Sequence, residues 1–407
     1  MSYREKADDG VAALSVDAQH SVTSLRSDRP FVTTWIRPER PAGGRRVLYR
    51  TRTAIDRIAA DYDLPLATGW RLRSGGEWRR EVTAIGNGAV SFDPAVSASL
   101  PVPALAQFDG MQRIAVLDGA VTWRKGDRSA EAGTRVEDIA ITVAASPGVA
   151  RVERRLGGFA HRLSVMRDRP RDHWALRLSR SRERLDPRDL SPIVVTVDPQ
   201  RLSRGNPLLR PQDVTTAEVE YGIDRSGLRA TATIFLRRTD RLIGEFYDIA
   251  GDGVLLRTAA NAGTRRSAGA EVTVGGPIGK AVKYGLAASF RRDGIDTDDG
   301  FGRTRAALTG YSLQASIDWD ATKRDKLHID ADRRGPDLLP QGRRSGTSGV
   351  NVVWRHTLSP RLTASLTARG LVQDSRVRTV IRTAVTTTDT DWVTDTRAVL
   401  FGLAVTR

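Results

Sequence analysis

The stretch that decides the fold is Leu362-Thr363-Ala364-Ser365-Leu366-Thr367-Ala368-Arg369, in which apolar and polar residues alternate. Successive side chains of a β-strand point to opposite faces, so this stretch predicts a strand with one apolar and one polar face. The same alternation occupies residues 313–319, where the polar row is Gln314, Ser316 and Asp318. It returns in about sixteen to twenty segments along the chain, and this repetition predicts an all-β fold.

Three features favour a large antiparallel transmembrane β-barrel over a soluble β-sandwich. The predicted strands are about ten residues long, whereas ordinary strands average about five or six. Short turns alternate with long connections, among them residues 182–211 and 291–305. Aromatic residues such as Trp319 and Trp354 lie toward the strand ends, where the interfacial girdles of barrels lie. A soluble basic all-β protein that binds polyanions remains an alternative, because sandwich strands also alternate.

In a barrel, the polar rows face the lumen. The candidate lumen-facing residues are Gln314, Ser316, Asp318, Thr363, Thr367 and Arg369. The apolar rows then face outward, toward the lipid of the outer membrane.

Composition excludes several other classes. The chain has 407 residues, and no apolar run approaches the ~20 residues of a membrane helix. It has no cysteine, which excludes disulfides, thiolate metal sites and a cysteine nucleophile. The net charge is +16, but the 64 basic residues are interleaved with 48 acidic ones along the whole length, so a nucleic-acid partner is not expected. No linker divides the sequence, which predicts one domain over residues 1–407.

Residues 176–222 contain an ordered set of turn-forming residues. Pro207 and Pro211 lack a backbone N–H group, so this segment cannot be a central strand. Gly205-Asn206-Pro207 is typical of a turn. The segment therefore predicts an ordered, extended loop that crosses the barrel rim before a strand resumes at Val214.

This stretch resembles the barrel of TonB-dependent outer-membrane receptors, in the branch often called outer-membrane β-barrel family proteins. That branch has a strand ending in Ser-x-Arg, then Leu-Asn-Pro, a Gly-Asn-Pro-x-Leu-x-Pro-Glu turn and a further strand. Ser191 stands where the family usually has Asn, and Gln212 stands where it usually has Glu. The resemblance extends over about residues 45–405. The family-motif loop residues are Gly205, Asn206, Pro207, Leu209 and Pro211.

The resemblance implies a place in the outer membrane of a Gram-negative bacterium and uptake of a scarce solute of the siderophore, cofactor or oligosaccharide class. The small-molecule ligand itself is not indicated.

Family receptors hold a plug domain inside a 22-stranded barrel, and an inner-membrane energy-coupling protein acts on the plug. No plug, coupling box or signal peptide is recognisable in residues 1–407, so we expect the barrel portion of a receptor, a fragment with about 16–20 strands that need not complete the barrel. We expect the inner-membrane energy-coupling protein to be a partner of this chain only if a plug is supplied. A non-transport outer-membrane barrel or scaffold is the other alternative.

Catalytic chemistry is not predicted. Asp330 and Asp332, and likewise Asp389 and Asp391, place two carboxylates on one strand face about 7 Å apart, a spacing compatible with calcium binding or acid–base work. We expect them to be lumen or loop carboxylates instead. The five histidines show no pairing suggestive of a triad. We therefore expect no enzyme activity, cofactor or metal site.

Overall fold

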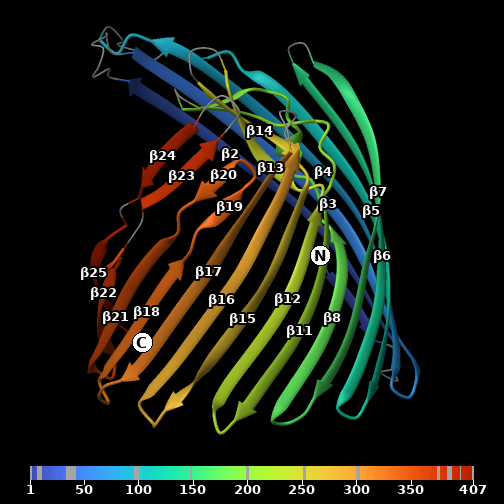
Figure 1. Cartoon of the computed structure of the whole chain (residues 1–407), viewed down its shortest axis with the longest axis vertical. Coiled ribbons are helices and arrows are strands. Elements are labelled where there is room, and N and C mark those ends of the chain that lie inside the picture. Colours follow the sequence, from blue (N-terminus) through green and yellow to red (C-terminus); the bar gives the residue numbers. More distant parts are fainter. Residues whose placement is uncertain are drawn as a thin grey trace.

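The computed structural model describes residues 2–6, 12–33, 43–95, 101, 103–146, 149–198, 201–250, 254–298, 303–373, 376–382, 387–394 and 396–405. Within these residues the chain forms 25 strands and one short 3-10 helix, η1 (Pro187–Leu190) (Figure 1). The predicted all-β fold is confirmed. No helix in these ranges is long and apolar enough to span a bilayer.

Seventeen strands form one large antiparallel sheet, in which each strand is hydrogen-bonded to the next. This count lies within the predicted 16–20, although many strands exceed the predicted ten residues, and β3 reaches 25. In order across the sheet the strands are β1 (Ser2–Lys6), β2 (Ala13–Thr33), β3 (Gly43–Ala67), β4 (Trp70–Phe92), β5 (Ala106–Lys125), β6 (Arg128–Ser146), β7 (Val149–Asp168), β8 (Asp172–Arg182), β11 (Asp213–Arg225), β12 (Leu228–Asp240), β15 (Thr264–Ile278), β16 (Val282–Asp298), β17 (Arg303–Asp320), β18 (Asp325–Arg334), β21 (Thr347–Ser359), β22 (Leu362–Arg369) and β25 (Ala398–Val405).

Short turns connect the strands at one end of the sheet, and most connections at the other end are long (Figure 1). The long connections carry two small four-stranded sheets. The strands of the first are β9 (Val195–Asp198), β10 (Arg201–Arg204), β13 (Ile243–Ile249) and β14 (Leu255–Asn261). The strands of the second are β19 (Asp337–Leu339), β20 (Gly342–Arg344), β23 (Arg376–Arg382) and β24 (Thr387–Val393).

One predicted connection is wrong. Residues 291–305 were expected to form a long loop, but β16 continues to Asp298 and β17 begins at Arg303. The charged residues of this segment are paired across the strands. Asp293 is buried and accepts hydrogen bonds from Arg265 at 2.6 Å and Arg291 at 2.8 Å. Paired in this way, the charges are compatible with a sheet.

The large sheet curves (Figure 1), and its two faces differ in polarity. We call the face against which η1 packs the inner face and the opposite one the outer face. Directly opposed residues of an antiparallel pair share a face, so the register traces each face from strand to strand. The outer face carries the apolar rows, and these side chains are exposed: Ile317 by 43%, Leu366 by 40% and Phe401 by 71%. A sandwich would cover such rows with a second sheet, whereas a bilayer covers them with lipid.

Aromatic side chains gather on the outer face near the short turns. The rings of Trp70 and Trp123 lie 6.5 Å apart between centroids on neighbouring strands. Trp174 lies opposite Tyr221 in the next part of the sheet. This is the arrangement of an interfacial girdle, which the sequence predicts from aromatic residues near strand ends.

The inner face holds the main apolar cluster. Among its buried members, Phe108, Ile114 and Ile139 come from the wall strands β5 and β6. Leu190 and Leu209 come from the connection between β8 and β11. The wall is open at one line, because among the described residues no pairing joins β25 to β1 or β2.

Candidate functional site: a pocket beneath the inner loop

The described residues of the connection between β8 and β11, 183–198 and 201–212, fold onto the inner face of the wall, and we call them the inner loop. It is held first by apolar packing, because Leu209 is completely buried and Leu190 is nearly so. Both contact a cluster of isoleucine, valine and phenylalanine side chains from β4, β5 and β6. Burial of such side chains is favourable by about 1.5–3 kcal/mol each, so these contacts fix the loop on the wall.

Polar contacts fix its position further. The Arg154 guanidinium of β7 donates hydrogen bonds to the carbonyl oxygens of Pro207 and Leu209, both at 2.7 Å. The Gln112 amide of β5 donates to the Leu185 carbonyl at 3.1 Å. Arg184 reaches in the other direction and pairs with Glu137 of β6 at 3.2 Å. The wall thus contributes both apolar and charged anchors to the loop.

The family-motif residues shape the centre of the inner loop. The Gly205 N–H donates to the Ser191 carbonyl, and the Asn206 N–H donates to the Asp189 carbonyl, each at 2.7 Å. A Cβ atom at Gly205 would lie 2.5 Å from the Asp189 carbonyl oxygen, so only glycine fits there. The Asn206 side-chain oxygen accepts from the Leu208 N–H at 2.9 Å, which closes the turn.

The rest of the motif continues to the wall strand. The Pro211 carbonyl accepts a hydrogen bond from Arg241 at 3.1 Å. The strand then resumes at Asp213, one residue before the expected Val214. The loop does more than cross the rim, because Leu209 reaches the apolar cluster of the inner face.

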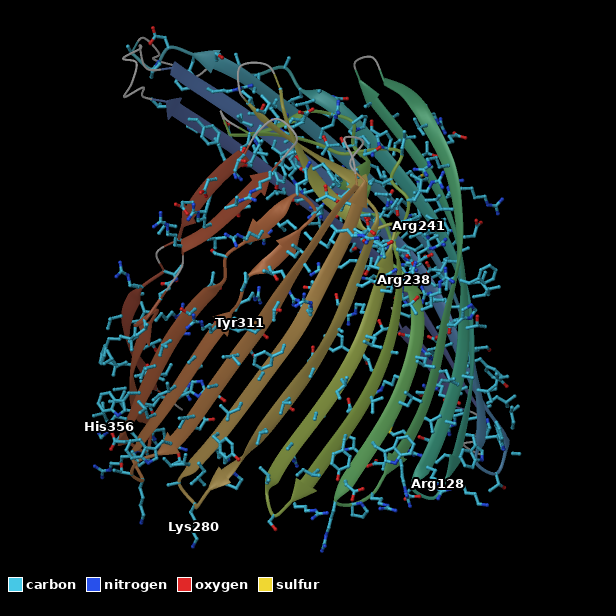
Figure 2. All side chains as sticks on the ribbon, in the orientation of Figure 1. Arg128, Arg238, Arg241, Lys280, Tyr311 and His356 are labelled. Carbon is cyan, nitrogen blue, oxygen red and sulfur yellow. The ribbon has the colours of Figure 1, made fainter. Side chains whose placement is uncertain are left out.

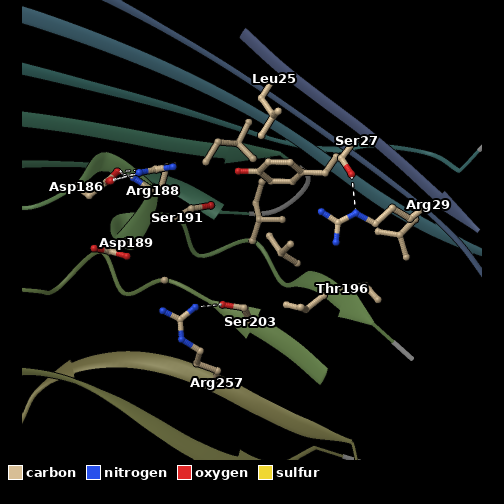
Figure 3. A pocket seen from close by; sticks show the side chains of 17 residues that line it. Leu25, Ser27, Arg29, Asp186, Arg188, Asp189, Ser191, Thr196, Ser203 and Arg257 are labelled. Carbon is tan, nitrogen blue, oxygen red and sulfur yellow. Dashed lines mark hydrogen bonds and ion pairs between the residues drawn. The ribbon is translucent and has the colours of Figure 1, made fainter. Parts of the chain in front are cut away.

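A pocket of about 480 Å³ lies between the inner loop and the inner face of β2–β4, at the long-loop end (Figure 3). Its apolar side consists of Leu25, Val47 and Ile85 from the wall and Ile193 from the loop. The polar groups that line it include Ser27, Arg29, Tyr49, Asp186, Arg188, Asp189, Ser203 and Arg257. An apolar surface with a few convergent polar groups is typical of a small-molecule site.

The charges of the pocket are partly neutralised. Asp186 and Arg188 form an ion pair at 2.5 Å, as do Arg257 and Glu245. Burial raises the pKa of Asp186, but the hydrogen bonds from Arg188 outweigh it and the pKa is lowered overall. Arg29 donates a hydrogen bond to the Ser27 hydroxyl at 2.8 Å and has no acidic partner in the described ranges.

Asp189 differs from its neighbour. Its partial burial, with the negative charge of Asp186, raises the pKa of its carboxyl above the ordinary value. Tyr247 of β13, nearby in the small sheet, has its pKa raised to about 12 by burial and by the Glu245 carboxylate that accepts its hydrogen bond. The tyrosine is therefore neutral at physiological pH, and Arg29 is the cation most available to an incoming ligand.

The predicted lumen-facing residues lie away from this pocket, on the inner face of the other half of the sheet. Ser316 is opposite Asp330, which is opposite Asn351, and Val353, on the same face as Asn351, is opposite Thr367. Gln314 and Asp318 share the face of Ser316, and Thr363 and Arg369 share that of Thr367. The register therefore brings both predicted polar rows to one face. That this face lines a lumen stays a prediction, because the wall is open among the described residues.

Three of the four carboxylates considered for calcium or acid–base chemistry have other partners. Asp389 and Asp391 are paired with Arg378 and Arg376 in the β23–β24 hairpin. Asp330 accepts a hydrogen bond from Asn351 at 2.7 Å. Nowhere in the described ranges do three or more His, Asp or Glu side chains gather as a metal site would require.

Sequence reasoning missed the pocket residues of the wall. Arg29 and Tyr49 belong to strands whose alternation is weak, and Arg257 comes from β14, far along the chain. No spacing in the sequence connects these segments. The one local signal was Asp186-Pro187-Arg188, a charged pair around a proline inside the motif stretch.

Comparison with known proteins agrees with this architecture. The family model "Outer membrane protein beta-barrel family" matches residues 5–404. The ferripyoverdine receptor of Pseudomonas aeruginosa, bound to ferripyoverdine, superposes with a TM-score of 0.68 at 12% identity, over 99% of this chain and 55% of that one. The ferric yersiniabactin uptake receptor FyuA of Yersinia pestis gives 0.66 at 11% identity, over 99% and 59%. The ferric-catecholate import receptor Fiu of E. coli K12, in its closed form, gives 0.65 at 13% identity, over 99% and 63%.

The chain thus spans less than two thirds of the length of each of these structures. At such identities the likeness concerns the fold. No curated protein matches the chain in sequence.

Proposed function

This chain belongs to the outer membrane protein β-barrel family, and from that premise we propose that it forms the wall and the outer ligand-binding end of a TonB-dependent receptor. It lies in the outer membrane of a Gram-negative bacterium, and its exposed apolar outer face meets the lipid. The observation that carries the proposal is the inner loop, which is anchored on the inner face and leaves a polar pocket at the long-loop end. In such barrels the long loops are extracellular, so the pocket is the first enclosed site that an external solute meets.

The proposed ligand is a scarce solute of the siderophore, cofactor or oligosaccharide class. Three of the similar structures are named as receptors for ferric chelates, which favours the siderophore class. The pocket supports a ligand with acidic groups, because Arg29 lines it without an acidic partner in the described ranges. Leu25 and Val47 beside it offer an apolar surface to the ligand body.

The proposed route continues along the inner face. Gln314, Ser316, Asp318, Thr363, Thr367 and Arg369 would offer hydrogen-bonding groups to a solute that moves from the pocket toward the short-turn end. Residues 1–407 form one barrel domain in this proposal. Energised release needs a plug on which an inner-membrane coupling protein acts, as the family resemblance implies. We expect no catalysis in this route.

Substitution of Arg29 tests the proposal. We expect Arg29→Ala to weaken binding of ferric citrate, an anionic ferric chelate, at least fivefold, because the pocket loses its free cation. Arg29→Lys should retain most of the affinity. Lys280→Ala is the matched control, because Lys280 is an exposed cation at the short-turn end of the sheet (Figure 2).

Binding is measured by equilibrium dialysis with the folded protein in detergent, and a neutral oligosaccharide serves as the comparison solute. Equal losses in Arg29→Ala and Lys280→Ala would contradict the pocket assignment. Failure of wild-type protein to retain either solute would favour the scaffold alternative over a receptor.

A further inference from the structure

An arginine cluster lies on the outer face at the long-loop end, outside the ligand pocket. Its members are Arg238, Arg266, Arg292 and Arg305 from the adjacent strands β12, β15, β16 and β17. All four are exposed. Arg238 lies at the upper end of β12, far from Lys280 at the short turns (Figure 2).

The cluster borders the apolar band of the outer face. Leu236, one position nearer the short turns than Arg238 on the same face, is 61% exposed, and Phe290 below Arg292 is 53% exposed. The Phe290 and Tyr311 rings lie 6.4 Å apart, and the Tyr311 hydroxyl accepts a hydrogen bond from Arg333 at 3.1 Å. Aromatic residues whose ring contacts lipid and whose polar group contacts water are typical of the membrane interface. The arginines therefore lie where the headgroups of the outer leaflet begin.

Like charges are crowded in this cluster. Arg238 and Arg266 are directly opposed across β12 and β15, a placement that is unfavourable for two cations. Arg238 is paired with Asp240 at 2.9 Å, and Arg305 with Asp296 at 3.3 Å. Arg266 and Arg292 have no ion pair in the part of the chain that the structure describes. The cluster thus holds more positive charge than its own acids neutralise.

The surface between these arginines is hollowed. A depression of about 790 Å³ has Gly294 and Ala307 among its lining, with Arg238, Arg266, Arg305 and Asp296 around it. A second one of about 500 Å³ adjoins it toward the membrane; Arg238 and Arg266 line both, and Arg292, Leu236 and Ala268 line the second. The boundary between the two has the charge for a phosphate group, and the apolar lining of the second suits an acyl chain.

We propose that the arginine cluster binds one phosphorylated glycolipid of the outer leaflet, with its phosphate between Arg238, Arg266 and Arg292 and an acyl chain along Leu236 and Ala268. Guanidinium groups bind phosphate oxygens through paired, charge-assisted hydrogen bonds. An anion at this place also removes the repulsion between Arg238 and Arg266. The bound lipid seals the wall at the interface and does not depend on what the pocket beneath the inner loop binds.

The test is lipid retention by the full chain, measured by native mass spectrometry of protein released from detergent. Diphosphorylated lipid A is the probe, and lipid A with both phosphates removed is the comparison lipid. We expect wild-type protein to retain one lipid A molecule, and Arg266→Ala/Arg292→Ala to bind it at least tenfold more weakly. These two arginines are chosen because their removal breaks no described ion pair.

Arg225→Ala/Lys280→Ala is the matched control, since it removes two exposed cations at the short-turn end. It should bind lipid A like the wild type. Should the double arginine variant fail to fold, as judged by its heat-modifiable mobility, wild-type binding must still weaken as salt increases, because the contact is ionic.

Three results would overturn the proposal: equal retention of lipid A by wild-type protein and Arg266→Ala/Arg292→Ala, equal retention of the phosphate-free lipid, or full displacement by inorganic phosphate alone. The last result would show an anion site without a lipid contribution. Equal retention of phosphatidylglycerol would show that the cluster recognises any anionic lipid, which also contradicts the glycolipid assignment.

Discussion

Replacement of Ile234 by arginine is expected to distinguish the lipid-facing outer face of the wall from its inner face. Ile234 is 65% exposed on the outer face of β12, opposite Val219 and Ala270. It lies about seven residues from the short turn, which at ~3.3 Å per residue and a tilt near 45° places it ~16 Å above that turn, near the middle of the apolar band. An arginine at the midplane costs about 2–4 kcal/mol, and the lost contact of the isoleucine with lipid adds about 1–2 kcal/mol.

Thr233→Arg is the matched substitution on the inner face. Thr233 lies opposite Glu220 on β11 and Glu271 on β15, so an arginine there gains carboxylate neighbours. We expect its free energy of unfolding to stay within about 0.5 kcal/mol of the wild type, as for ordinary surface substitutions. Urea unfolding in phospholipid vesicles, followed by tryptophan fluorescence, measures both variants. Equal destabilisation at the two positions would refute the assignment of the faces or of the bilayer.

The remaining predictions concern the inner loop. Leu209→Ala should destabilise the loop by about 2–5 kcal/mol, because it leaves a cavity in the apolar cluster, and protease cleavage within residues 183–212 should become faster. Gly205→Ala should detach the loop as well, since its Cβ would meet the Asp189 carbonyl, whereas Ser203→Ala, two residues away, should leave cleavage unchanged. Asp189→Asn should slow cleavage at pH 7, because the raised pKa of Asp189 means that its ionisation opposes loop docking. The wild type should regain this stability as the pH falls through the folded-state pKa, and the difference should vanish below the ordinary value of 3.8; a difference that grows toward low pH would contradict this sign.

The strands and faces of the wall were predictable from sequence because they depend on residues that are neighbours in the chain. Alternation such as that of residues 362–369 depends only on neighbours along the strand, and it gives the class of fold, the outer and inner faces and the girdle. The pairing of Ser316 with Asp330 and of Asp330 with Asn351 then follows from hairpins that are adjacent in the chain.

The pocket was not predictable because its contacts are distant in sequence. Arg29 and Ser203 line the same pocket only because the inner loop turns back onto β2–β4, and no periodicity encodes that turn. The motif residues indicated an ordered loop but not its direction. The depth of the loop depends on Leu209 meeting Ile114 and Ile139, a match of shapes between segments about 70–95 residues apart.

The open line of the wall has a consequence that follows from parity. Strands alternate in direction, so the first and the seventeenth, β1 and β25, run parallel, whereas β2 and β25 run antiparallel. Among the described residues β1 pairs with Ala13–Asp17 of β2, and the edge of β2 from Gln19 onward has the direction that β25 needs. In hydrocarbon each unpaired backbone group costs several kcal/mol, so we expect the bilayer to favour pairing between these two edges. A seam between them can be no longer than the eight residues of β25, and we expect lateral opening of the wall to begin there.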